Sequence, residues 1–190
     1  DDPDSVDCLE ILLAQAEKSE DWAEAGDYIQ RVLELDASPA YLRKAVRIYS
    51  ALERYVTAVG YAAMLAEDPE VSADDLEVHA DILIVLERYE RARSVLNDAR
   101  ERADTGRQRS SIWFTLSTIA EDEEERKAAL QQSLFEDSLN FDTLVSLSAF
   151  FEERGDYRKA RQFLSQAATL RPEDRTIGAH LAELQEKADE

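Results

Sequence analysis

A repeat of 34 residues constrains this chain more than any other feature of its sequence. The phrase Leu52-Glu53-Arg54-Tyr55 returns as Leu86-Glu87-Arg88-Tyr89, and two periods after Tyr89 the same position holds Tyr157. An alanine follows each tyrosine by three residues, at Ala58, Ala92 and Ala160. A period of this length indicates a stack of similar units, in which each unit buries its apolar face against its neighbours.

Each period contains two apolar stripes at helical spacing, separated by a short polar turn. In the second unit the first stripe runs from Tyr41 to about Leu52 and the second from Tyr55 to Leu65, before Pro69. Spacing of 3.6 residues indicates helices, so each unit is a helical hairpin and the chain is all α. The apolar stripe of Ile177, Leu181 and Leu184 predicts a final helix that covers the open end of the last hairpin.

The first and fourth units fit the register least well. The first slips by one residue, and in the fourth the alanine position is occupied by Arg126. Either the helices of the fourth unit splay apart or its frame shifts, and Trp113 is a core residue in both cases. Ser117 takes the position of Tyr49 in the second unit, and Gly106 is expected to end the third unit in a left-handed conformation.

The residues that recur resemble the tetratricopeptide repeat family, whose units follow the pattern W-x2-L-G-x2-Y, A-x3-F, A-x4-P. In the fifth unit the matching residues are Leu144, Leu147, Ser148, Phe151, Ala160, Leu164, Ala167 and Pro172. The resemblance implies an α-solenoid of five hairpins in a right-handed superhelix, a single domain over residues 1–190. Its units cover about residues 6–38, 39–72, 73–106, 107–140 and 141–174, and a capping helix covers about 175–188.

The resemblance also implies a function and a face. Members of this family bind an extended peptide or a helix in a concave groove lined by the first helices. In this chain, the groove candidates for partner binding are Arg43, Arg47, Glu77, Asp81, Asp142 and Glu152. The clamp of Lys, Arg and Asn by which some members hold acidic chaperone tails is absent, so that activity is not predicted.

Arg43 and Arg47 allow two interpretations. One helical turn apart, their guanidinium groups can point together at a carboxylate or phosphate of a ligand. Alternatively they form ion pairs with Glu77 and Asp81 of the next unit and with Glu10 of the preceding one. The acidic groove positions otherwise favour a basic or mixed-charge ligand.

Composition narrows the choice of partner. The formal net charge of −20 arises from 42 acidic and 22 basic side chains and would repel nucleic acids and anionic membranes. No apolar run approaches the ~18 residues that span a bilayer, so no membrane insertion is expected. The compartment stays open: the cytoplasm is favoured, with the periplasm or secretion as alternatives if a signal peptide has been removed.

The sequence offers little that points to catalysis. Cys8 lacks a partner for a disulfide or a metal set, and His79 and His180 are too far apart in the repeat order to share a site. We therefore expect no enzyme, catalytic residue, cofactor or metal, and a protein-interaction module or scaffold. The alternatives are a self-associating homo-oligomeric subunit of a larger assembly, or a repeat fragment tethered to a catalytic domain absent from this chain.

Overall fold

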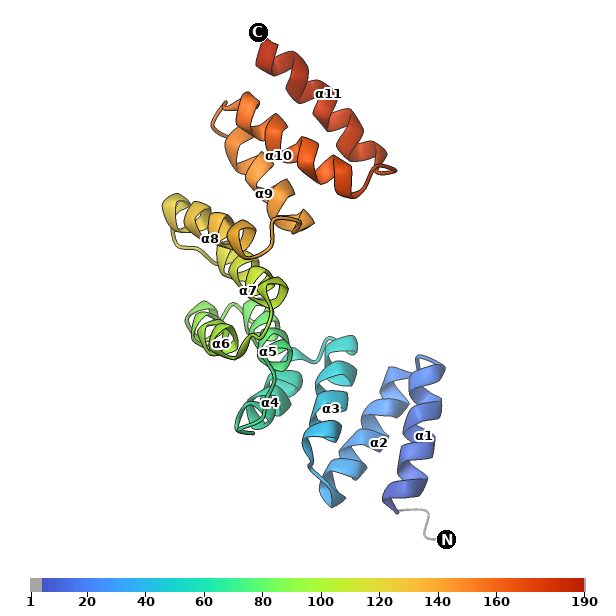
Figure 1. Cartoon of the computed structure of the whole chain (residues 1–190). Helices are drawn as coiled ribbons and strands as arrows, with labels where there is room; N and C mark the ends of the chain where they lie inside the picture. The colour runs from blue at the N-terminus through green and yellow to red at the C-terminus, as the bar shows by residue number, and fades with distance from the viewer. Residues whose placement is uncertain (1–4, 190) are drawn as a thin grey trace. The chain divides into compact units, whose positions relative to one another are not determined.

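A computed structural model describes residues 5–189, and within that range the chain forms helices and no strand (Figure 1). The helices of the first two hairpins are α1 (Val6–Lys18), α2 (Trp22–Leu35), α3 (Pro39–Ala51) and α4 (Tyr55–Ala66). The next two hairpins consist of α5 (Ala73–Val85), α6 (Tyr89–Arg102), α7 (Gly106–Thr118) and α8 (Glu123–Glu136). The last hairpin and the final helix are α9 (Phe141–Glu152), α10 (Tyr157–Leu170) and α11 (Arg175–Asp189).

Each helix packs against the one that follows it within its hairpin, and the hairpins group into two compact units. The first unit extends to Arg102, and in it α2 packs on α3 and α4 on α5. The second begins at Ala103, and in it α8 packs on α9 and α10 on α11. The expected all-α helical-repeat solenoid is confirmed, whereas a single domain and a right-handed superhelix stay predictions.

The 34-residue register is visible in the structure. Tyr55, Tyr89 and Tyr157 are each the first residue of the second helix of their hairpin. The alanine three residues later is fully buried in all three hairpins, as is Ala25 in the first. A side chain larger than a methyl group would separate the helices there, which explains why the position recurs.

The turns inside four of the five hairpins share one backbone conformation. Glu20, Glu53, Glu87 and Gly155 have φ values of 57°, 56°, 57° and 71°, in the left-handed region. The amide after each donates to a carbonyl five residues earlier, for example Arg54 N to Tyr49 O at 2.8 Å. This is the Schellman ending of an α-helix, in which glycine is the residue of lowest strain. Three of the four turns therefore carry a glutamate where glycine would be easier to accommodate.

The fourth hairpin departs from the others because α7 begins one residue early. Its cap is Thr105, which accepts from Gln108 N, so the residue eleven positions after the cap is Leu116. The expectation that Ser117 takes the place of Tyr49 is therefore wrong, although both are buried. Trp113, expected in the core, is only half-buried, and Ile112 is fully buried instead.

The shift also changes the role of Gly106. It is the first residue of α7, and it does not have the positive φ that we expected for the end of the third unit. A Cβ atom at this position would lie 2.6 Å from the carbonyl oxygen of Glu136. Glycine is needed here because the end of α8 approaches the start of α7 closely, which is a different reason from the one predicted.

Arg126 occupies the position that alanine holds in the other second helices. It is half-buried, and its guanidinium group lies 5.9 Å from the ring centre of Phe150 on α9 and 3.6 Å from Glu153. Arg154 stacks closer on the same ring, at 3.5 Å. The contact of Arg126 with this ring thus links the fourth hairpin to the fifth, whereas the Arg154 contact lies within the fifth. Of the two outcomes we considered for this unit, the frame shift is the one observed.

A buried group of hydroxyls also joins these two hairpins. Ser110 of α7, Ser133 of α8 and Thr143 of α9 are fully buried. Ser133 Oγ donates to Ser110 O at 2.7 Å and lies 2.7 Å from Thr143 Oγ1, while Asn140 Nδ2 donates to Ser110 Oγ at 2.8 Å. Each hydroxyl has a partner, so the group avoids the cost of an unpaired buried polar atom.

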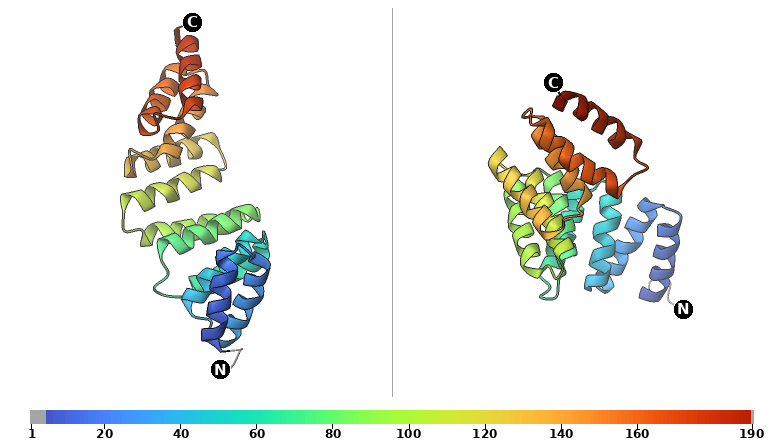
Figure 2. Two further views of the ribbon diagram at one scale, coloured as in Figure 1. Left: turned by 90° about the vertical axis from the view of Figure 1, so that its right-hand side faces the viewer. Right: turned by 45° about the horizontal axis from the view of Figure 1, so that its top comes forward.

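The final helix α11 covers α10 as predicted. Ile177 and Leu184 are buried against Ala160 and Leu164 of α10. Helices α9, α10 and α11 follow one another as neighbours in all the views (Figures 1 and 2). The expected capping role of residues 175–188 is thus consistent with the contacts of the second unit.

Candidate functional site

The two arginines predicted to face the groove lie together on the exposed face of α3. The helix begins after Ser38 with Pro39 and turns its apolar residues toward the core. Arg43 and Arg47 lie one turn apart on the opposite face, with 45% and 61% of their side chains exposed. Both guanidinium groups are therefore accessible, as the functional interpretation requires.

Both arginines also have carboxylate partners on neighbouring first helices. Arg43 donates to both oxygens of Asp75 on α5, with its Nη2 at 2.9 Å. Arg47 pairs with Glu17 on α1. Such exposed pairs contribute ~0–1 kcal/mol each, so a ligand carboxylate can compete for them.

The pairing between units that we considered is thus observed, with different partners from Glu77, Asp81 and Glu10. Glu10 instead accepts a hydrogen bond of 2.7 Å from the hydroxyl of Tyr41, which raises the pKa of Tyr41 to about 12. Burial alone would raise the pKa of Asp75, but hydrogen bonds from Arg43 and Ser72 more than offset it and lower that pKa. Ser72 caps α5 and fixes Asp75 in the first turn of that helix, before both Glu77 and Asp81, where Arg43 reaches it.

A pocket of about 380 Å³ opens between α3, α4 and α5, entirely within the first unit. Its wall includes both arginines and Asp75, and its remaining lining residues are Val46, Ser50, Ala62, Leu65 and Val78. Val78 keeps 46% of its surface exposed, whereas Ala62 and Leu65 are buried. The hydroxyl oxygen of Ser50 is buried and has no hydrogen-bond partner. The pocket thus combines an apolar floor, an unpaired hydroxyl and a charged rim.

Two of the predicted acidic residues lie on α5 beside this pocket. Asp81 follows Val78 by one helical turn, and its side chain is exposed. Neighbouring protein atoms partly desolvate the carboxylate of Asp81 and so raise its pKa. A cation placed there would restore the lost stabilisation of the charge. Glu77, the other acidic candidate on this helix, is half-buried.

The remaining candidates belong to the second unit and differ from one another. Asp142 is exposed in the first turn of α9. Glu152, at the other end of α9, accepts from Lys187 Nζ at 2.8 Å and contacts His180 Nε2 at 2.6 Å, both on α11. Hydrogen bonding to Lys187, followed by His180, lowers the pKa of Glu152 despite some desolvation. Glu152 thus attaches α11 to α9. A binding site that includes both Glu152 and Arg43 stays a prediction.

Among residues 5–189 no group of three or more His, Cys, Asp or Glu side chains is placed to hold a metal ion. No helix in the same range is long and apolar enough to cross a membrane. Burial lowers the pKa of His79, whose Nδ1 has no partner.

Reasoning from the sequence put Arg43 and Arg47 on one face of a helix, as observed, but missed the pocket beside them. Ala62 takes the position that Leu96, Leu130 and Leu164 hold in the later units, and this smaller side chain is the signal that the sequence offers. The roles of Asp75 and Glu17 follow from side-chain reach, which the repeat pattern does not encode.

Comparisons with known proteins address the fold. No family model matches the chain, and no curated protein matches its sequence. Among solved structures, the peptide-binding tetratricopeptide repeat protein YrrB is 16% identical, with a TM-score of 0.67 over 96% of this chain and 94% of that one. PilF of Pseudomonas aeruginosa is 17% identical, with a TM-score of 0.74 over 97% and 86%.

MamA of Desulfovibrio magneticus is 16% identical, with a TM-score of 0.73 over 89% of this chain and 97% of that one. These likenesses cover nearly the whole of both chains, and identities this low speak for the fold alone. The resemblance found in the repeat pattern and the helical hairpins of the structure therefore agree with the solved neighbours: the chain has the tetratricopeptide repeat fold.

Proposed function

We propose that this chain is a non-enzymatic protein-interaction module that binds a peptide of a partner protein at the pocket between α3, α4 and α5. The observation that carries the proposal is the combination of an apolar floor with Arg43 and Arg47 at its rim. The solved neighbours support a binding role, since the one named YrrB is described as having a peptide-binding site. A fold of this kind holds its ligands on a preformed surface.

The pocket suits a peptide of mixed charge. An apolar side chain of the ligand would fill the space between Val46 and Val78, because burying it removes apolar surface from water on both sides. A neighbouring Lys or Arg would meet the exposed carboxylate of Asp81. An acidic group would compete with Asp75 for Arg43. Asp142, Glu77 and Glu152 do not line this pocket.

A peptide-display selection on the intact chain tests the proposal. We expect enriched sequences to share an apolar residue next to a basic one, and we expect their binding to weaken with salt. Val78→Glu puts a charge in the wall of the pocket and is expected to abolish binding. Val85→Glu is the matched control, because Val85 lies on the same helix, is 55% exposed and does not line the pocket.

Selection without any enriched sequence would contradict the proposal. So would selected peptides that bind the Val78→Glu variant as tightly as the parent chain. Circular dichroism of both variants would establish that the fold is intact.

Self-association is the second candidate. Ile11 and Leu12 of α1 are 69% and 37% exposed, and such side chains often mark a contact between proteins. Sedimentation of the chain at increasing concentration would detect a dimer. Ile11→Glu should return that dimer to a monomer, and a chain that stays monomeric throughout excludes this candidate.

A further inference from the structure

Helix α11 has the place of the first helix of a sixth hairpin. One period of 34 residues relates Gly178, Leu181, Ala182 and Gln185 of α11 to Leu144, Leu147, Ser148 and Phe151 of α9. In the fifth hairpin this face of α9 packs on its own second helix, α10. Ser148 Oγ donates to Ala160 O at 2.8 Å, and the Phe151 ring stacks on Phe163 at 5.6 Å.

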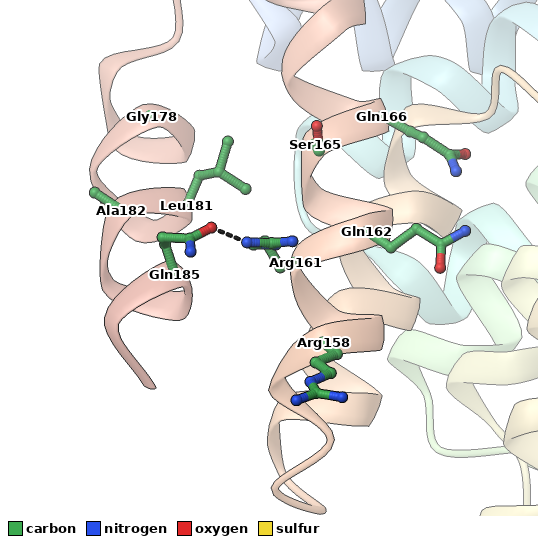
Figure 3. Close-up of a pocket in the computed structure, with 9 residues that line it drawn as sticks. All are labelled: Arg158, Arg161, Gln162, Ser165, Gln166, Gly178, Leu181, Ala182 and Gln185. Carbon is green, nitrogen blue, oxygen red and sulfur yellow. Dashed lines mark hydrogen bonds between the residues drawn. The ribbon is translucent and has the colours of Figure 1, made fainter. Parts of the chain in front are cut away.

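The corresponding face of α11 borders an open groove. A pocket of about 830 Å³ lies along α10 and α11 (Figure 3). Its lining residues on α10 are Arg158, Arg161, Gln162, Ser165 and Gln166, and those on α11 are Gly178, Leu181, Ala182 and Gln185. The groove therefore lies where the repeat geometry would place the second helix of a sixth hairpin. The small residues Gly178 and Ala182 leave space on its α11 side.

The charge of the groove is unusual for this molecule. The chain carries 20 more acidic than basic groups, yet among the described residues that line the groove only Arg158 and Arg161 are ionised. Arg161 is hydrogen-bonded to the amide of Gln185 across the groove, as Figure 3 shows, and this neutral partner leaves its charge in place. Among the described residues neither arginine forms an ion pair with a carboxylate.

We propose that this groove between α10 and α11 binds an acidic amphipathic helix of a partner protein. The bound helix would lie as the second helix of a sixth hairpin does, with its apolar side on Leu181 and Ala182 and its carboxylates at Arg158 and Arg161. This site belongs to the second unit and does not depend on the peptide pocket in the first.

The repeat geometry also sets the direction of the bound helix. A second helix begins where its first helix ends, so the incoming helix begins near Gln185, which Arg161 contacts. Carboxylates in its first turn would then face the two arginines. Negative charge in the first turn also suits the dipole of the bound helix itself.

Helix α8 of this chain provides a defined probe. It is a second helix of the same fold and begins with Glu123, Glu124 and Glu125 after the cap Asp122. The probe is a synthetic fluorescent peptide of residues 120–138 with blocked ends, titrated with the intact chain and followed by fluorescence anisotropy. A second peptide with Gln in place of the three glutamates measures the part due to charge.

We expect saturable binding that weakens when salt rises from about 50 to about 300 mM and that falls at least ~10-fold with the glutamine peptide. Arg158→Glu combined with Arg161→Glu should cause a similar loss. Gly178→Phe should block the groove, and Gly60→Phe is its control. A Cβ at either glycine meets no atom within 4 Å, and Gly60 lies on α4, which is not one of the two helices that line the groove.

The outcomes separate clearly. Loss of binding with Gly178→Phe and the charge reversals, but not with Gly60→Phe, supports the proposal. No saturation up to ~1 mM chain, or equal binding by Gly178→Phe, overturns it. A third outcome is that the parent chain binds no peptide and sediments as a dimer that Gly178→Phe dissociates. In that case the occupant of the groove is a second copy of the chain, and the proposal is overturned. Thermal unfolding of each variant confirms that the fold is retained.

Discussion

Replacing Glu53 and Glu87 by glycine should stabilise the protein although it removes two side chains. Both residues have φ near +57° at the end of a first helix, where an L-residue is strained by about 1–2 kcal/mol. Both residues are exposed. The substitution therefore removes strain at the cost of a side chain that lies in solvent.

The gain is reduced by the greater freedom of glycine in the unfolded chain, about 0.5–1 kcal/mol. Each substitution should thus raise the free energy of unfolding by about 0.5–1 kcal/mol. The two turns belong to different hairpins, so the double variant should gain about 1–2 kcal/mol. For a chain of this size that corresponds to a rise in Tm of about 2–8 °C.

Urea unfolding followed by circular dichroism at equilibrium measures the effect. Glu67→Gly is the matched control, because Glu67 is an exposed glutamate at the end of α4 whose φ is −76°. It should lose stability, since glycine relieves no strain there. Gly155→Ala should also lose about 1 kcal/mol, because its φ is 71° although a Cβ would meet no atom. If Glu53→Gly lowered the unfolding midpoint as Glu67→Gly does, the argument from backbone strain would be refuted.

Three other predictions concern residues that the structure places in unusual surroundings. His79→Leu should raise stability by about 1–2 kcal/mol at pH 7 because it removes the unpaired Nδ1. Burial lowers the pKa of His79, so the parent chain should lose stability as pH falls below the unfolded value of about 6.5, and urea titrations should show this slope absent from the variant. Gly106→Ala should cost about 1–3 kcal/mol in thermal unfolding because its Cβ meets Glu136 O, whereas Gly178→Ala, with open space around it, should gain up to about 1 kcal/mol; equal effects would refute the packing argument. The lowered pKa of Glu152 means that its pairing with Lys187 is present above the unfolded carboxyl pKa of about 4.3 and is lost as pH falls through the folded value. Hydrogen exchange should therefore show α11 loosening between about pH 5 and pH 3, and Glu152→Gln should make the helix looser at neutral pH, by less than about 1 kcal/mol, and remove the pH dependence.

The repeat predicted the fold well because its signals are local and recur. Alanine at position 58 and at its equivalents marks where two helices touch, and the tyrosines mark where second helices begin, so the helix boundaries followed. The early start of α7 was not predictable in the same way. Gly106 fits a helix end in the sequence, and only the approach of Glu136 shows why it stands there.

The candidate site was predicted in part for a related reason. Helical spacing places Arg43 and Arg47 on one face, and this is confirmed. Helical spacing does not predict which carboxylate a long, flexible arginine side chain will reach. Asp75 is the partner of Arg43 because a hydrogen bond of 2.7 Å from the Ser72 hydroxyl holds its carboxylate in place. The attachment of Glu152 to α11 has a faint signal, since His180 and Lys187 are two turns apart on one side of that helix.

The hydroxyl group formed by Ser110, Ser133 and Thr143 has a consequence for how this chain can change. Junctions made of alanine and leucine accept any similar hairpin, so such units can be duplicated or exchanged during evolution or in design. The Ser133–Ser110 bond lies within the fourth hairpin, and two hydrogen bonds cross to the fifth, between Ser133 and Thr143 and from Asn140 to Ser110. Placing the fifth hairpin against a junction of alanine and leucine would leave Thr143 and Asn140 without these partners, so we expect the two hairpins to be exchanged together more readily than apart.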